Sequence, residues 1–104
     1  MPNVGESTPA SQHAIGTKAI AVTNTAIALA SSSVQCRAVI ICAHPSNAAQ
    51  VWVGNSSVVS DPAGSETGIV LQANEKFSLD IDDVSKGFVN GTAGDKVTFI
   101  ALQQ

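Results

Sequence analysis

Short β-rich stretches recur along this chain, and short polar turns separate them. Clear examples are Ala19–Leu29, Gln50–Val53, Ile69–Leu71 and Lys76–Ile81, which are rich in β-branched or alternating apolar residues. Clusters of Ser, Asn, Gly and Pro follow at intervals of about ten residues, as in domains built from strands and turns. The pattern predicts about seven or eight short antiparallel strands without a helix of ordinary length. We therefore expect an all-β fold: a single small β-sandwich or jelly roll, with a small barrel as the alternative.

Two segments in the N-terminal half have a less simple pattern. Lys18–Ala30 alternates small and β-branched residues, which predicts one bent strand or two consecutive strands with a bend at Asn24. The alternation places Ile20 and Val22 on the same face. Val34–Ala43 is apolar at almost every position in its second half. This favours a central strand that is covered on both sides.

The two cysteines lie in this last segment. Cys36 and Cys42 are six residues apart, which separates their Cα atoms by roughly 20 Å in a continuous strand. A disulfide requires less than about 7 Å, so we expect two free thiols. The spacing also places both side chains on one face. Small buried hydrophobic side chains are the favoured interpretation there, and a metal or redox role is the alternative.

The C-terminal segment contains two further β-rich runs, Gly87–Val89 and Lys96–Ile100. Asn90–Asp95 lies between them and is rich in Gly, Asn and Asp. These residues tolerate left-handed backbone conformations, so the segment predicts a hairpin closed by a five- or six-residue loop.

The N-terminal segment Met1–Gly16 differs from the rest of the chain, because it has two prolines, two glycines and no sustained periodicity. We expect an extended or disordered arm there, which could lie across a neighbouring subunit. Residues 17–104 are expected to form the sandwich, since a chain of 104 residues typically folds as one domain. Its core would consist of small side chains that each contribute little burial, so we also expect self-association.

Charged residues are scarce in this chain. They make up 12% of the sequence, and the formal net charge is −3. Lys and Arg are spread along the chain rather than clustered with aromatic residues, so nucleic acid is not an expected partner. The sequence predicts neither a secretory signal nor a membrane-spanning stretch. A surface with so little charge is more typical of a protein that works within an assembly.

The densest acidic cluster consists of Asp80, Asp82 and Asp83. Asp80 and Asp82 have the alternate spacing of calcium ligands, but the glycine turn and the distal Glu of a calcium loop are missing. Without an aromatic platform nearby, the same pair is also a poor candidate for glycoside hydrolysis. The favoured interpretation is a solvated strand end in which Asp83 or Ser85 bonds local backbone amides.

The remaining candidates for chemistry are few. His13 and His44 are the only histidines, and both are expected in exposed turns. Ser46 lies near His44, but this adjacency carries no catalytic motif. Two His and two Cys could form a zinc site only by long-range coincidence. Trp52 is interpreted as a core residue in preference to a ligand platform. We therefore expect no enzymatic activity, no metal and no cofactor.

The order of the segments carries one more signal. It runs through Ala19–Leu29, Ser33–Ala43, Asn47, Val51–Gly54, Gly68–Leu71, Ile81–Lys86 and Val89–Phe99. This order resembles a group of short structural proteins of tailed-phage virions. The resemblance covers about Lys18 to Leu102, is most specific in Val89–Phe99, and contains no catalytic signature. Met1–Gly16 has no counterpart in it.

The resemblance implies a virion structural protein, most similar to proteins that decorate or cement the capsid exterior, often as jelly-roll or sandwich trimers. We therefore expect a homotrimer, made in the host cytoplasm, that binds the major capsid protein of a phage. The candidate contacts with other copies or with the shell are Val4, Ile15, Asp61, Pro62 and Glu66. The alternatives are another virion part, such as a head-fibre base, neck or tail protein, and a carbohydrate- or cell-surface-binding module.

Overall fold

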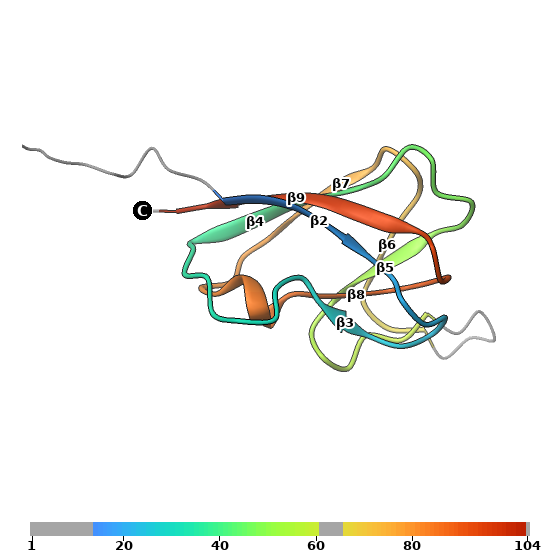
Figure 1. Ribbon diagram of the computed structural model, residues 1–104, viewed down its shortest axis with the longest axis horizontal. Helices are drawn as coiled ribbons and strands as arrows, with labels where there is room; N and C mark the ends of the chain where they lie inside the picture. The colour runs from blue at the N-terminus through green and yellow to red at the C-terminus, as the bar shows by residue number, and fades with distance from the viewer. Residues whose placement is uncertain (1–13, 61–65, 104) are drawn as a thin grey trace, which may run out of the picture.

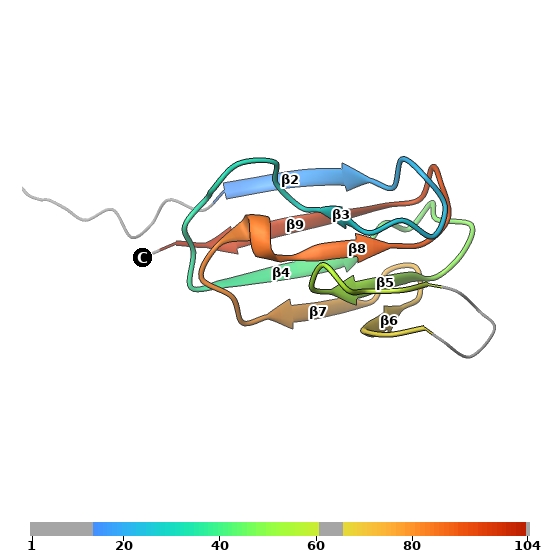
Figure 2. The same cartoon turned by 90° about the horizontal axis from the view of Figure 1, so that it is seen from below.

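Two antiparallel sheets pack face to face in the computed structural model, which describes residues 14–60 and 66–103 (Figures 1 and 2). The described residues form eight strands and one 3-10 turn. The strands are β2 (Ala14–Ala19), β3 (Ile27–Ala28), β4 (Ala38–Ala43), β5 (Val51–Gly54), β6 (Ile69–Leu71), β7 (Lys76–Leu79), β8 (Phe88–Asn90) and β9 (Lys96–Leu102), and the 3-10 turn is η2 (Val84–Lys86). This confirms the prediction of an all-β fold with short strands.

The two sheets have the strand orders β2-β9-β4-β7 and β3-β8-β5-β6, and all pairings are antiparallel. Consecutive strands cross between the sheets at every step except from β5 to β6. Figure 1 shows the two layers one above the other, and Figure 2, which looks onto the sheets, shows connections at both ends of the strands. This strand order is consistent with a jelly roll, in which two Greek keys build a double sheet.

Alternate side chains from the two sheets meet to form the core. Most of the fully buried side chains are small and β-branched, as the composition predicts, and they include Val39, Ile41, Val51, Val53, Val89 and Val97. Phe99 adds one larger group, which packs against the core from β9. Its ring lies directly over Gly16, where an added Cβ would come within 2.8 Å of Phe99 Cζ. A glycine at this position of β2 therefore lets the ring lie close to the backbone.

The predicted C-terminal hairpin is wrong. Its two runs become β8 and β9, which belong to different sheets and do not pair with each other. The intervening turn instead crosses the edge of the sandwich, and Asp95 at its end is buried. The Asp95 carboxylate accepts hydrogen bonds from the backbone N–H of Ala48 and Ala49, each at 3.0 Å. Glycine and asparagine thus mark a sharp change of direction, but they do not reveal which strand is the partner.

The boundaries near the N-terminus also differ from the prediction. β2 begins at Ala14, so the last three residues assigned to the arm belong to a strand; residues 1–13 lie outside the described residues. The expected bend is present at Asn24, whose φ is 57°. However, Ile20 is buried whereas Val22 is 60% exposed. The alternation from Ile20 therefore does not continue, because the chain leaves the sheet after β2.

The cysteines were expected on one face of a single strand, and this is wrong. β4 begins only at Ala38, after a bend at Arg37. Cys36 is buried in the core, and its thiol donates a hydrogen bond to the carbonyl of Ile81 at 3.3 Å. Burial raises the pKa of the Cys36 thiol, and the nearby Asp83 and Asp82 charges add to the effect. Cys42 is half-buried on the outer face of β4, and both thiols are free, as predicted.

The core position predicted for Trp52 is also wrong. Val51 and Val53 point inward from β5, so Trp52 between them points to the outer face of the second sheet. It is half-buried there, beside Val70 of β6 and Asn90 of β8. Strict alternation along a strand thus placed the tryptophan outside, and the preference of large aromatic side chains for the core did not override it.

Two glycines with positive φ provide a test of this packing. Gly68 has φ +101°, and an added Cβ would lie 2.6 Å from the carbonyl oxygen of Val53. Gly94 has φ +95° with nothing within 4 Å of that position. In both Gly→Ala variants, backbone strain should lower the free energy of unfolding by about 1–2 kcal/mol. For Gly68→Ala the free energy of unfolding should fall by at least about 1 kcal/mol more, because the added methyl group must also displace the backbone carbonyl of Val53. Equal losses in urea unfolding experiments would contradict this packing.

Candidate functional site

The outer face of the sheet β2-β9-β4-β7 carries an apolar row. Ile15 of β2 lies opposite Ile100 of β9, which in turn lies opposite Ile40 of β4. The next pair along the strands, Ala38 and Leu102, extends the apolar surface. Ile15 is 77% exposed, whereas Ile40 and Ile100 are half-buried by their neighbours. We call these five residues the apolar row.

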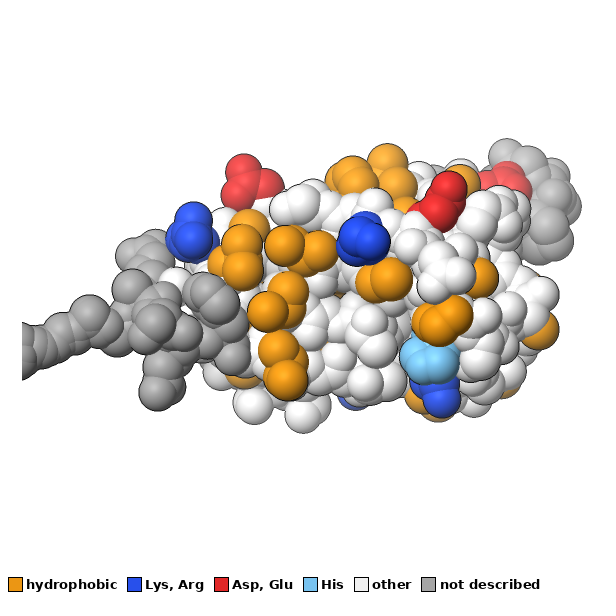
Figure 3. Space-filling model, turned by 90° about the horizontal axis from the view of Figure 1, so that it is seen from above, with side chains coloured by type: hydrophobic (Ala, Val, Ile, Leu, Met, Phe, Trp, Pro, Cys, Tyr) orange, Lys and Arg blue, Asp and Glu red, His pale blue; other side chains and the backbone are white. Residues whose placement is uncertain are grey.

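The surroundings of the apolar row contain little charge. Figure 3 shows hydrophobic side chains gathered on this face of the molecule and only a few separate charged groups, one of them near the middle of the view. The outward positions of β2 are Ile15, Thr17 and Ala19, and none of them is charged. On the outer face of this sheet, the described strands carry charge only at Lys76 and Lys96. An apolar stripe with so few charges is typical of a surface that contacts another protein.

This surface also corrects the prediction for the apolar segment Val34–Ala43, which was expected to be covered on both sides. β4 buries Val39, Ile41 and Ala43 on its inner face, but within the described residues its outer face is only half-buried. A strand that is apolar on both faces normally has a covering layer on each. Within the described residues, no second layer covers the outer face of β4.

The outer face of the second sheet is organised differently. Asn90 is 2% exposed, although it points outward. Its Oδ1 accepts a hydrogen bond from the Ser60 hydroxyl at 3.0 Å, and its Nδ2 donates to the Val58 carbonyl at 3.0 Å. The Ser60 backbone N–H donates to Asn24 Oδ1 at 3.2 Å. Loops therefore cover this face, and the polar groups beside Trp52 are used inside the fold. No local pattern along the chain indicates this long-range network.

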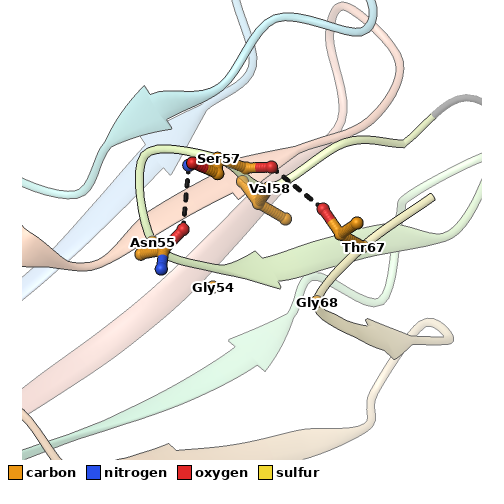
Figure 4. Close-up of a pocket in the computed structure, with 6 residues that line it drawn as sticks. All are labelled: Gly54, Asn55, Ser57, Val58, Thr67 and Gly68. Carbon is orange, nitrogen blue, oxygen red and sulfur yellow. Dashed lines mark hydrogen bonds between the residues drawn. The ribbon is translucent and has the colours of Figure 1, made fainter. Parts of the chain in front are cut away.

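A shallow pocket of about 320 Å³ lies at one end of the second sheet (Figure 4). Its lining residues are Gly54, Asn55, Ser57, Val58, Thr67 and Gly68. The Thr67 hydroxyl donates to the Ser57 carbonyl at 2.9 Å, and the Ser57 N–H donates to Asn55 Oδ1 at 2.8 Å. The side chains of Asn55 and Thr67 thus bond to the walls of the pocket, and none of these six lining residues is acidic or basic. These bonds stabilise the loop around the pocket.

The acidic cluster has a structural role that matches the prediction. Asp83 caps η2 by accepting from the Ser85 N–H at 2.9 Å, and it also accepts from the Val34 N–H at 3.1 Å. The hydroxyl groups of Ser33 and Ser85 donate to the same carboxylate. These bonds, that of Ser33 first, hold the pKa of Asp83 well below its usual range. Asp83 therefore ties the loop after β3 to the turn before β8.

His44 and Ser46 are the pair that the sequence analysis considered as possible members of a catalytic triad. The Ser46 Oγ lies 2.7 Å from His44 Nδ1, and the Ser46 N–H donates to the same nitrogen at 3.1 Å. Both contacts close a local turn over two residues. Within the described part of the chain, no carboxylate bonds to His44, so the contact lacks the third member of a catalytic triad. His44 is half-buried rather than fully exposed as expected.

The residues predicted as assembly contacts fall into two groups. Val4, Asp61 and Pro62 lie outside the described residues, as does His13. Ile15 is the most exposed member of the apolar row, and Glu66 is exposed beside the 61–65 segment. Ile40, Ile100 and Leu102 were missed as candidates. Their period-two positions in two apolar segments would have indicated a second hydrophobic face.

Comparisons with known proteins found no matching family model, no matching curated protein and no matching solved structure. Among residues 14–60 and 66–103, no three His, Cys, Asp or Glu side chains are placed to hold a metal ion. The search for membrane spans found no sufficiently long apolar helix in the described residues. The apolar row is therefore the most distinctive surface feature of the described residues.

The lowered pKa of Asp83 predicts an acid-sensitive fold. The group stays ionised in the folded state to a lower pH than in the unfolded chain, where its pKa is about 3.9. Its stabilising contribution is therefore complete above that value and falls as the pH drops toward the folded pKa. Asp83→Asn should flatten the loss of stability between about pH 5 and pH 2, as measured by urea unfolding. Asp80→Asn, at an exposed carboxylate, is the control, and an equal effect of the two substitutions would contradict the assignment.

Proposed function

We propose that this protein is a structural component of a tailed-phage virion, a decoration protein that binds the capsid exterior by protein–protein contact. The observation that carries the proposal is the apolar row, which crosses three neighbouring strands and has no covering layer in the described chain. The major capsid protein is the proposed partner. The resemblance of Lys18–Leu102 to short virion proteins supports the same assignment.

The chemistry of the apolar row suits a contact with a repetitive surface. Burying an exposed isoleucine contributes about 1.5–3 kcal/mol, so one such face binds modestly by itself. A capsid offers the same site many times, and linked copies bind more strongly through avidity. A protein that binds only the assembled lattice also stabilises that lattice by mass action. Such a role requires a rigid scaffold and a complementary face, and it needs no catalytic group.

A carbohydrate-binding module is the second candidate, because Trp52 lies on an outer face. Sugar recognition needs an exposed aromatic ring and free polar groups that converge on the ligand. Trp52 is half-buried, and the amide of Asn90 beside it is bonded to Ser60 and Val58. We therefore place this function second. Quenching of Trp52 fluorescence by glycans would favour it over decoration.

The direct test is binding to undecorated capsids of the phage that encodes the chain. The double variant Ile40→Thr/Ile100→Thr keeps β-branched side chains on the two strands but removes apolar surface from the face. We expect capsid binding at least roughly tenfold weaker, by cosedimentation. The matched control Ile69→Thr/Val70→Thr alters exposed residues on the other sheet, which are 45% and 42% exposed. The control should bind like the parent protein.

The possible outcomes separate the hypotheses. If only the control loses binding, the second sheet is the docking face and the proposed surface is wrong. If the unmodified protein fails to bind capsids, decoration itself is wrong. A cryo-EM map of the virion gives an independent answer: we expect density of this size across the shell, and density at the tail or neck would favour another virion part.

A further inference from the structure

β2 is an open sheet edge with an unusual combination of features. It stands first in the order β2-β9-β4-β7 and lies at the front of the upper sheet in Figure 1. With six residues it is longer than the other described edge strands, β3, β6 and β7, which have two, three and four. The outer side of β7 carries Lys76, a charge that discourages edge pairing. β2 has no charged residue among its outward positions.

The backbone groups that face this open edge can be identified from the hydrogen bonds of the neighbouring turn. The Ile20 N–H donates to the Asp95 carbonyl at 2.8 Å, so the backbone N–H of Ile20 points to the side of the strand on which β9 lies. Backbone groups of successive residues alternate between the two sides of an antiparallel strand. Gly16 and Lys18 therefore bond to β9, and the N–H and C=O groups of Ile15, Thr17 and Ala19 point to the open edge. Within the described residues nothing else bonds to these groups.

We propose that β2 is the site of self-association, and that two copies pair their β2 strands antiparallel around a two-fold axis at Thr17. This inference rests on the edge alone and does not depend on the proposed virion function. In this register Thr17 faces Thr17 of the second copy, and Ile15 faces Ala19 of the second copy. Each facing pair can exchange two N–H···O=C hydrogen bonds. The β2-β9-β4-β7 sheets of the two copies then form one continuous sheet across the dimer.

The side chains favour a second copy over an unrelated strand. Thr opposite Thr is a favourable cross-strand pair, and a large isoleucine opposite a small alanine fits on both sides of the axis. The one charged residue of β2, Lys18, lies opposite Gly16 of the second copy and not opposite its own counterpart. No like charges face each other across the axis, and every outward contact is repeated by symmetry, as an isologous interface requires.

The size of the contact sets its strength. Six residues span about 20 Å along the strand, so the edge alone buries less than a standard interface of about 800 Å² per partner. The dimer is therefore expected to be weak and concentration-dependent in solution. It also differs from the trimer that the sequence resemblance implies.

The first experiment combines light scattering with amide hydrogen exchange on the full chain across a range of concentrations. We expect a monomer–dimer equilibrium. In the dimer, the amides of Ile15, Thr17 and Ala19 should become protected, whereas those of Gly16 and Lys18 should be protected in both states. A monomer at all concentrations, a closed trimer, or association without protection of these three amides would each overturn the proposal.

A charge-pairing experiment tests the two-fold register itself. Thr17→Lys and Thr17→Glu each place like charges across the axis and should each weaken self-association by roughly fivefold or more. A mixture of the two variants should recover association, as a heterodimer, because opposite charges then face each other. Thr98→Lys is the matched control, since Thr98 lies opposite Thr17 on β9 and shares its outer face. If Thr98→Lys also blocks association, or if the mixture fails to recover it, the edge pairing is wrong.

Discussion

The register of β9 is the constraint on which the rest of this structure depends. β9 lies between β2 and β4, and it pairs with both of them over six residues. Because side chains alternate along each strand, one register decides the inward and outward residues of all three strands together. A slip of one residue would carry Val97 and Ala101 to the surface and Ile100 into the core. The slip is therefore unfavourable, because it would expose the buried apolar side chains of β9 and would place the larger Ile100 in the close-packed core.

This register has a consequence for the outer face. Since Val97 and Ala101 are committed to the core, the alternate residues Ile100 and Leu102 must point outward, next to Ile40. The fold would accept threonine or serine at these outward positions, since Thr17 and Thr98 occupy the neighbouring row on the same face. The apolar row is therefore not required by the sandwich. Its place on the molecule follows from the register, whereas its hydrophobic character is the feature on which the proposed contact rests.

The sequence predicted local features well and long-range ones poorly. The strand composition and the turns identified most strands, including Ile69–Leu71, and the role of Asp83 followed from its position near Ser85. The hairpin of β8 and β9 was wrong because turn residues report a change of direction and not the sheet to which each strand belongs. The network of Asn90, Ser60 and Asn24 joins residues far apart in the chain, so no local pattern could indicate it. The alternate apolar positions of β4 and β9 are visible in their own segments, but the pairing of three strands is what joins them with Ile15 into one row.

The open edge and the apolar row together indicate how such a small protein could act. They share Ile15, which is the outermost member of the row and also lies on the edge strand. Pairing at the edge would leave the outward side chains of β4 and β9 uncovered, because edge hydrogen bonds lie in the plane of the sheet and the row projects from it. Self-association and attachment to a larger surface could therefore occur at the same time. Each contact is weak alone, and their combination on a repetitive lattice would be strong, because linked sites raise one another's effective concentration.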